Sequence, residues 1–221
     1  NRSTSARLVD STVGSVSAVA RPAGVTVEAI SSQSASDISV GLAVGLIGGG
    51  TASGIITIFN ANTQAVIEGG VMRAGSATVS ADSTNGYFAA AGAGAGGLFG
   101  GFAGAFVVGV SKNVTVARVG ATGKATTLQL NGDLNVTSAS HNAFSSNAYA
   151  AAGGVIASPV AGMALVTVVA NDTQALLRDA TINIAAGATV PLTSTTTRPA
   201  GIVLSAIEDL SAKPYTGGGA F

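Results

Sequence analysis

The chain has 221 residues, of which only 9% are charged, and its ten acidic and ten basic residues give a net charge of zero. This balance excludes the basic patch that nucleic-acid binding requires, so we expect no nucleic-acid partner. The absence of Cys excludes disulfides, thiolate metal sites and a Cys nucleophile.

The first predicted feature along the chain is an internal repeat of about 52–59 residues, marked by four similar segments that each contain a central alanine. The clearest pair is NTQAVIE at residues 62–68 and DTQALLR at residues 172–178. The anchoring alanines are Ala6, Ala65, Ala117 and Ala175. They divide the chain into units of about residues 1–60, 61–112, 113–170 and 171–221, the last of which is atypical. We expect one repetitive segment of a longer chain in which each unit stacks on the previous one.

Each anchor is followed by a β-like run, a polar patch and a long uncharged stretch rich in Gly and Ala. The β-like runs are residues 25–30, 77–81, 134–139 and 181–184, and the uncharged stretches are residues 38–59, 87–110 and 148–170. From Ile38 to Leu46, large residues alternate with small ones, a period of two that indicates a strand. Glycines 48–50 interrupt this alternation and residues 55–59 resume a β-branched run, so the stretch predicts a β-hairpin.

The second and third stretches repeat this alternation. Phe102 and Phe106 share one face of the second stretch, as Leu42 and Val44 do in the first, and we predict these four residues to be packing residues. Gly96–Gly97 is a candidate turn in the second stretch, and Gly153–Gly154 or Ser158–Pro159 could turn the third. A strand with one large and one small face lets sheets pack closely on the small side.

An asparagine precedes each internal anchor, at Asn62, Asn113 and Asn171. In a stacked coil these residues could form an amide ladder, in which each side chain bonds to the one above it. The alternative is that Asn serves only as a turn residue at these points. The stacking residues predicted from the repeat are Asn62, Asn113, Asn171, Ala65, Ala117 and Ala175.

The sequence gives little support for nucleotide-binding, metal or catalytic sites. Gly92, Gly94 and Gly97 satisfy G-x-G-x-x-G, but no helix-forming run follows and no acid lies about 20 residues on, which argues against nucleotide binding. His141 is the only histidine, and its polar surroundings predict a turn. The acidic residues are scattered. We therefore expect no catalytic residues, metal, cofactor or enzymatic activity. The uncharged runs are long enough for membrane-spanning helices, but their period of two argues against an embedded segment.

Residues 132–139 (GDLNVTSA) resemble the recurring G-D-[LV]-x-V-x-[SA]-x element of large secreted bacterial exoproteins. With the Gly/Ala stretches and the T-Q-A anchor, the chain resembles filamentous-haemagglutinin-type and leukotoxin-type filamentous adhesins over most of residues 1–190. The resemblance implies a right-handed parallel β-helix, export to the bacterial cell surface, and a role in adhesion or matrix formation.

Together these observations predict an all-β fold, a right-handed parallel β-helix (β-solenoid) with Gly/Ala-rich β-hairpin extensions. The expected function is a structural repeat of an extracellular fibre or adhesin whose partners are copies of itself. An uncovered sheet edge would let the next copy dock. Two alternatives remain: a module that binds a host or neighbouring-cell ligand through polar patches such as residues 137–147, and a Gly/Ala-rich multi-span membrane protein.

Overall fold

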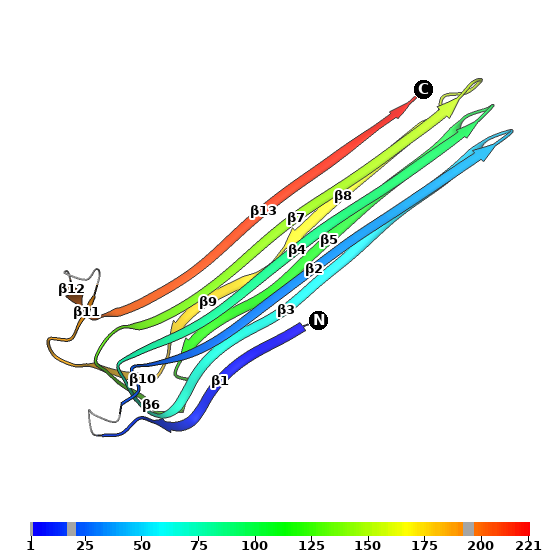
Figure 1. The fold of residues 1–221 in the computed structure, drawn as a ribbon. Helices are drawn as coiled ribbons and strands as arrows, with labels where there is room; N and C mark the ends of the chain where they lie inside the picture. The colour runs from blue at the N-terminus through cyan, green and yellow to red at the C-terminus, as the bar shows by residue number, and fades with distance from the viewer. Residues whose placement is uncertain (1, 17–20, 192–196) are drawn as a thin grey trace.

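The computed structural model describes residues 2–16, 21–191 and 197–221, which form strands joined by turns and loops, without a helix (Figure 1). In chain order the strands are β1 (Arg2–Val13), β2 (Gly24–Gly45), β3 (Gly49–Ala74), β4 (Ser76–Gly97), β5 (Gly101–Val119), β6 (Thr126–Leu130), β7 (Leu134–Gly154), β8 (Val160–Val169), β9 (Asp172–Leu177), β10 (Ala180–Ile184), β11 (Thr189–Pro191), β12 (Thr197–Pro199) and β13 (Ile202–Ala220). The predicted all-β class is therefore confirmed.

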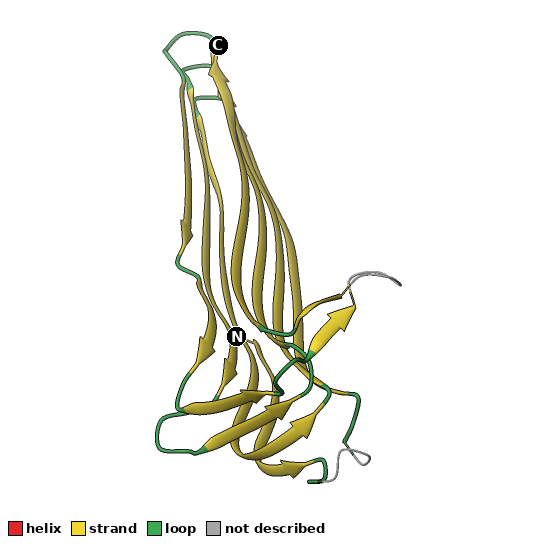
Figure 2. Cartoon of the chain, turned by 90° about the vertical axis from the view of Figure 1, so that its left-hand side faces the viewer, coloured by secondary structure: helices red, strands yellow, loops and turns green. Residues whose placement is uncertain are grey.

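Two parallel sheets make up the body of the molecule. The β3 sheet has the order β10-β6-β3-β5-β8, with β1 also paired to β3 and β9 to β5. The β4 sheet has the order β13-β7-β4-β2, and β11 and β12 form a small antiparallel pair. Figure 2 shows the two sheets facing each other along a long arm. We call the end with the turns at residues 46–48, 98–100 and 155–159 the tip, and the end with β6 and β10 the base.

The parallel pairings join residues about one repeat apart. Strand β2 pairs with β4, and β3 with β5, at an offset of 52 residues, whereas β4 pairs with β7 at 57 and β5 with β8 at 58. The alanine anchors are register partners: Ala6 pairs with Ala65, Ala65 with Ala117, and Ala117 with Ala175. The alignment of anchors that the repeat predicts is thus present in the hydrogen-bonded register.

The last unit continues the β4 sheet although its sequence is atypical. Strand β13 pairs with β7 along its whole length, but at an offset of 68 residues, outside the predicted range of 52–59. The offset is longer because the β11–β12 pair and its flanking segments lie between β10 and β13.

The predicted β-hairpins are wrong. Strands β2 and β3 follow each other across a tight turn, but they lie in different sheets, and each pairs with a strand one repeat away. The physical reason is the small face of each strand. Two Gly- and Ala-rich faces can approach closely across the interior, whereas a hairpin would place both strands in one sheet and leave those faces without a partner.

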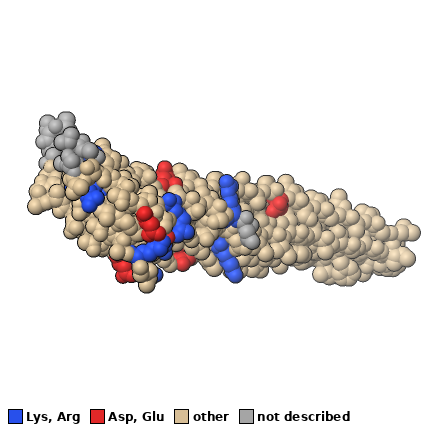
Figure 3. Space-filling model, turned by 90° about the horizontal axis from the view of Figure 1, so that it is seen from below, with Lys and Arg blue, Asp and Glu red and all other residues tan. Residues whose placement is uncertain are grey.

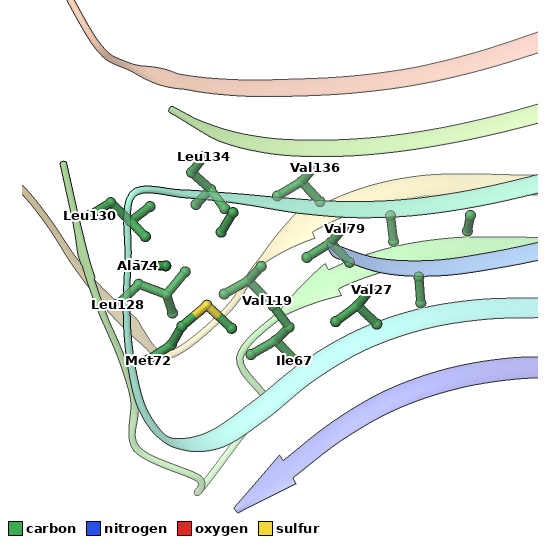
Figure 4. Packing of buried hydrophobic residues seen from close by; sticks show 14 of the residues in the cluster. Val27, Ile67, Met72, Ala74, Val79, Val119, Leu128, Leu130, Leu134 and Val136 are labelled. Atoms are coloured by element: carbon green, nitrogen blue, oxygen red, sulfur yellow. The ribbon is translucent and has the colours of Figure 1, made fainter. Parts of the chain in front are cut away.

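The interior holds two apolar clusters. Near the base, Val, Leu, Ile and Met side chains from both sheets, including those of β6, fill the interior (Figure 4). Leu128, Leu134 and Val136 are fully buried there. Along the arm the interior is thinner and consists largely of Ala. Among the described residues, larger rings enter the interior of the arm at one level, where Tyr87 contacts Phe59 and Phe144 edge to face at centroid distances of 5.8 and 6.2 Å.

A buried polar belt lies on the strands between the two clusters. Asn142 Oδ1 accepts hydrogen bonds from the side-chain amides of Asn85, at 3.0 Å, and Asn113, at 3.2 Å. Each of these three asparagines also donates to the serine two residues before it: Ser83, Ser111 and Ser140. Asn113 belongs to the β3 sheet and the other two to the β4 sheet, so the belt ties the sheets together. It gives each buried side-chain amide a hydrogen-bond acceptor, whereas Asn85 Oδ1 has no partner.

The predicted amide ladder is therefore only partly right. Asn113 Nδ2 and Oδ1 are both engaged in the interior, and the Asn113 N–H donates to Asn171 Oδ1 at 3.1 Å. Asn62, in contrast, is exposed and pairs in register with Val114 instead of Asn113. Because side chains alternate across a strand, this one-residue difference places Asn62 on the opposite face of the sheet.

Gly109 provides a direct test of how closely the sheets approach. Its position faces the interior, where a Cβ would lie 3.2 Å from the Tyr87 ring. Gly109→Val should lower the free energy of unfolding by about 1–3 kcal/mol, because the added methyls overpack the arm. Gly104→Val is the matched control on the same strand, since a Cβ there meets nothing within 4 Å and should be neutral. Denaturant unfolding followed by circular dichroism measures both, and equal effects would contradict the close packing.

Candidate interaction surface

Toward the tip, most large side chains of the arm point outward. The structure exposes Leu42 by 81%, Val44 by 92%, Phe102 by 66% and Phe106 by 41%. The prediction that these residues pack within the fold is wrong, although the strand alternation behind it is correct. The interior accepts the Gly and Ala faces of both sheets, and this leaves each large face without a partner inside the chain.

The outer half of the arm carries no charged residue. Uncharged segments run through residues 38–67, 83–111, 142–171 and 214–221, which all reach the tip or flank it. Figure 3 shows charged side chains from the base to somewhat beyond the middle of one face and none at the distal end. Contiguous apolar surface of this kind, rare on monomers, usually marks a site of interaction.

The outer face of the β4 sheet is hollowed into a groove. The residues that form it lie side by side as register partners on neighbouring strands. Its floor consists of Gly92, Gly94 and Gly96 of β4 with Ala151 and Gly153 of β7. One wall is Val40, Leu42 and Val44 of β2, and the other is Tyr149, Tyr215 and Phe221. Two adjoining hollows of about 580 and 700 Å³ make up the groove.

The outer face of the β3 sheet is raised along its central strand instead of hollowed. Phe102 of the central strand β5 stands between Gly50 of β3 and Val160 of β8 in one register column. Phe106 lies between Gly54 and Ala164, and its ring covers Gly54, where a Cβ would approach the ring to within 2.1 Å. We call Phe102 and Phe106 the ridge. It lies on the face opposite the groove.

The tip repeats an apolar pair in each of its three turns. Leu46–Ile47, Leu98–Phe99 and Val155–Ile156 are all exposed. The turns are stacked by backbone hydrogen bonds, from the Phe99 N–H to the Ile47 carbonyl at 3.0 Å and from the Ile156 N–H to the Leu98 carbonyl at 2.8 Å. The apolar outer surface therefore continues over the end of the arm.

Charges concentrate at the base around one buried carboxylate. Glu68 Oε1 lies 2.6 Å from Arg7 Nη2, and Glu68 Oε2 lies 2.7 Å from Arg118 Nη2, so the carboxylate joins three successive repeats. Lys124 Nζ lies 3.5 Å away. Burial raises the pKa of Glu68, but the hydrogen bond from Arg7 and the charges of Arg7, Lys124 and Arg118 outweigh it and hold the pKa below the ordinary 4.5.

A second carboxylate belongs to the GDL motif that carries the family resemblance. Asp133 Oδ2 lies 2.5 Å from Arg198 Nη2, and its Oδ1 accepts a hydrogen bond from the Gly201 N–H at 2.9 Å. These two hydrogen bonds, that from Arg198 first, hold the pKa of Asp133 below its ordinary value of 3.8. The aspartate thus fixes the segment that leads into β13 against the start of β7.

The polar patch at residues 137–147 lies within strand β7, and alternation divides it between two faces. Ser138, Ser140 and Asn142 are buried in the interior and belong to the belt or bond across it. His141 is exposed on the outer face, 3.8 Å from Asp209, and is not in the turn we predicted. Only half of this patch is therefore available to a ligand, which weakens the binding-module alternative.

Comparison with models of protein families, with curated proteins and with solved structures found no match to this chain. Among the described residues, no helix is long and apolar enough to cross a membrane. The runs considered as membrane-spanning helices are strands instead.

Two sequence signals for this surface were available but missed. The alternating large residues at 38–44 align, 52 residues on, with Ala90 and the glycines of the groove floor. This alignment predicts that large side chains on one strand stand beside small ones on the next. The motif S-x-N occurs at residues 83–85, 111–113 and 140–142, and each instance supplies one asparagine of the belt.

Proposed function

We propose that this chain is a structural segment of an exported bacterial fibre or adhesin, and that its arm associates with further copies of itself. In this proposal the stacked repeats form a right-handed parallel β-helix, in which each turn of the chain adds one strand to both sheets. The pairing of consecutive repeats at regular offsets supports the coil. Right-handed crossover connections are strongly preferred between parallel strands of one sheet, and this supports the hand.

The observation that carries the proposal is the uncharged arm with apolar residues on both outer faces and at the tip. Burying such faces against other molecules removes apolar area from water at roughly 25 cal/mol per Å². Two oppositely directed apolar faces on one rod allow a copy to dock on each side. Addition can then continue without closing, which is the geometry of a filament or matrix.

Edge-to-edge addition, our initial expectation, finds less support at strand β13. Its inward positions include Glu208, whose carboxylate accepts hydrogen bonds from Asn171 Nδ2 and Thr173 Oγ1 at 2.7 and 2.8 Å. Pro214 on the same strand lacks an N–H donor. Inward charge and proline are devices that block strand addition, so the outer faces are the better candidates for self-association.

The proposal is tested by sedimentation velocity of the purified chain over a range of concentrations, with negative-stain electron microscopy of the same samples. We expect assembly that increases with concentration and with added sulfate, because sulfate strengthens apolar burial while screening charge. A chain that remains monomeric at all concentrations in sulfate would refute self-association.

A further inference from the structure

We propose that self-association occurs by insertion of the Phe102–Phe106 ridge of one copy into the glycine-floored groove of the next copy, with the two arms parallel and offset by about two residues along their length. This inference rests on the proposed function and names the surfaces that would carry it.

The first argument is complementary relief. The ridge is high on its central strand, with Gly50 or Gly54 beside each phenylalanine on β3. The groove is low along β4 and along β7 beyond Tyr149, and it is high at β2 on one side and at Tyr149 and Tyr215 on the other. A central ridge fits a central groove, whereas two ridges or two grooves in contact would leave voids that forfeit dispersion contacts.

The second argument is spacing along the arm. Phe102 and Phe106 are four residues apart, about 13 Å in a strand, and so are Gly92 and Gly96 of the groove floor. Ridge and groove also lie at nearly the same height. A Cβ at Gly101 would lie 2.8 Å from the Ala95 carbonyl oxygen, and a Cβ at Gly109 would lie 3.2 Å from the Tyr87 ring. Because β4 runs toward the tip and β5 runs away from it, Phe102 is level with Gly94 and Phe106 with Ala90. A sideways translation combined with a shift of about two residues, roughly 7 Å, along the arm brings Phe102 to Gly96 and Phe106 to Gly92.

The third argument is area. The uncharged arm face spans about 10 residues, and on the ridge side it consists of the three strands β3, β5 and β8. This corresponds to roughly 33 Å by 14 Å, or on the order of 450 Å² on each partner. The total of about 900 Å² is the size of a weak, reversible contact. A second copy also matches the absence of charge on both faces, since no ion is left buried without a partner.

A lipid bilayer is the competing occupant, and the fold argues against it. The arm has open sheet edges at β2, β13 and β8, whose backbone groups would find no hydrogen-bond partners in hydrocarbon. Contact between two copies leaves these edges in water while it buries only the outer faces.

The absence of cysteine from the chain allows a clean cross-linking test. Single variants Phe106→Cys and Gly92→Cys are mixed under mild oxidation, and the proposal predicts a covalent dimer that contains one of each. Phe106→Cys mixed with Val108→Cys is the control, because both residues lie on the ridge face. Preferential cross-linking in the control mixture, or none in the first, would overturn the proposed contact.

Two double variants test the same contact without cross-linking. Phe102→Ser/Phe106→Ser removes the ridge. Gly92→Leu/Gly96→Leu fills the groove at two positions where a Cβ meets nothing closer than 4.0 Å, so the fold should persist. Each variant alone should lose about 100-fold or more in self-association, because buried aromatic anchors carry most of an interface's energy. A mixture of the two should form a dimer that does not grow, since one retains its groove and the other its ridge.

The outcomes separate the inference from the proposed function. If the wild-type chain assembles and both double variants assemble equally well, the ridge and groove are not the contact, although self-association stands. If the wild-type chain remains monomeric, both ideas fail. If it remains monomeric yet floats with neutral phosphatidylcholine vesicles, and the ridge variant does not, the ridge binds lipid and the inference is overturned.

Discussion

Asn113→Ala should lower the free energy of unfolding by about 3 kcal/mol, the largest loss among the three asparagines that precede the alanine anchors. Asn113 Oδ1 accepts the buried Ala61 N–H at 3.0 Å, and its Nδ2 donates to both Ser111 and Asn142. Truncation leaves that N–H and part of the belt unsatisfied in a dry interior, and each orphaned group costs about 1–3 kcal/mol.

The other two asparagines are matched controls with graded expectations. Asn171→Ala should cost about 1 kcal/mol, because its Oδ1 accepts from Asn113 and Ser111 at a half-buried position where water can substitute. Asn62→Ala should cost less than about 0.5 kcal/mol, since its side chain is exposed. Chemical denaturation followed by circular dichroism suits a chain without Trp. Equal losses of stability at all three positions would support a uniform amide ladder and contradict the special role of Asn113 in the buried polar belt.

Glu68→Gln should destabilise the chain by about 2 kcal/mol at neutral pH, since hydrogen bonds to charged groups contribute about 1.5–3 kcal/mol and the variant leaves three cations facing an uncharged amide. Glu28→Gln, on the exposed outer face of β2, is the control and should have little effect. The measurement is the unfolding free energy of each variant at constant ionic strength. An effect no larger than that of the control would show that the cluster contributes nothing.

The same carboxylate predicts how stability depends on pH. Glu68 and Asp133 have folded-state pKa values below their ordinary values of 4.5 and 3.8. Each therefore contributes stability that is fully present above its ordinary pKa and is lost as the pH falls through the lower, folded value. The melting temperature should decrease steeply below about pH 4.5, and Glu68→Gln/Asp133→Asn should flatten the curve. An equally steep decrease in the double variant would assign the acid sensitivity to other groups.

Much of the arm could be predicted from the sequence because its signal is periodic. The alternation at residues 38–46 gives the strand, and the alanine anchors give the stacking of repeats. Periodicity does not say which face is inside. The general rule that large apolar residues are buried predicts that Leu42 and Phe102 pack inside, but toward the tip the space between the two facing sheets is filled almost entirely by small residues.

The polar residues were harder to place for a related reason. Ser-, Asn- and Asp-rich patches ordinarily mark turns, yet β2, β4 and β7 each continue through such a patch without interruption. A strand tolerates Asn142 inside only because Asn85 and Asn113 lie beside it and opposite it, and that meeting depends on the register of two sheets. The ion pairs of Glu68 likewise join residues from three repeats, and no local sequence pattern contains all three.

The alternation of side chains between the two faces of each strand limits which insertions and deletions this chain can accept during evolution. Loss of one residue within β5 would turn Phe102 toward an interior that has no space for it, so strands can change length only by twos. The repeat offsets agree with this constraint. They increase from 52 to 56 across the loop between Val119 and Thr126, and from 57 to 58 across the tip turn, never within a paired strand. Relatives of this chain should therefore differ freely in their loops while their arms lengthen or shorten in even steps.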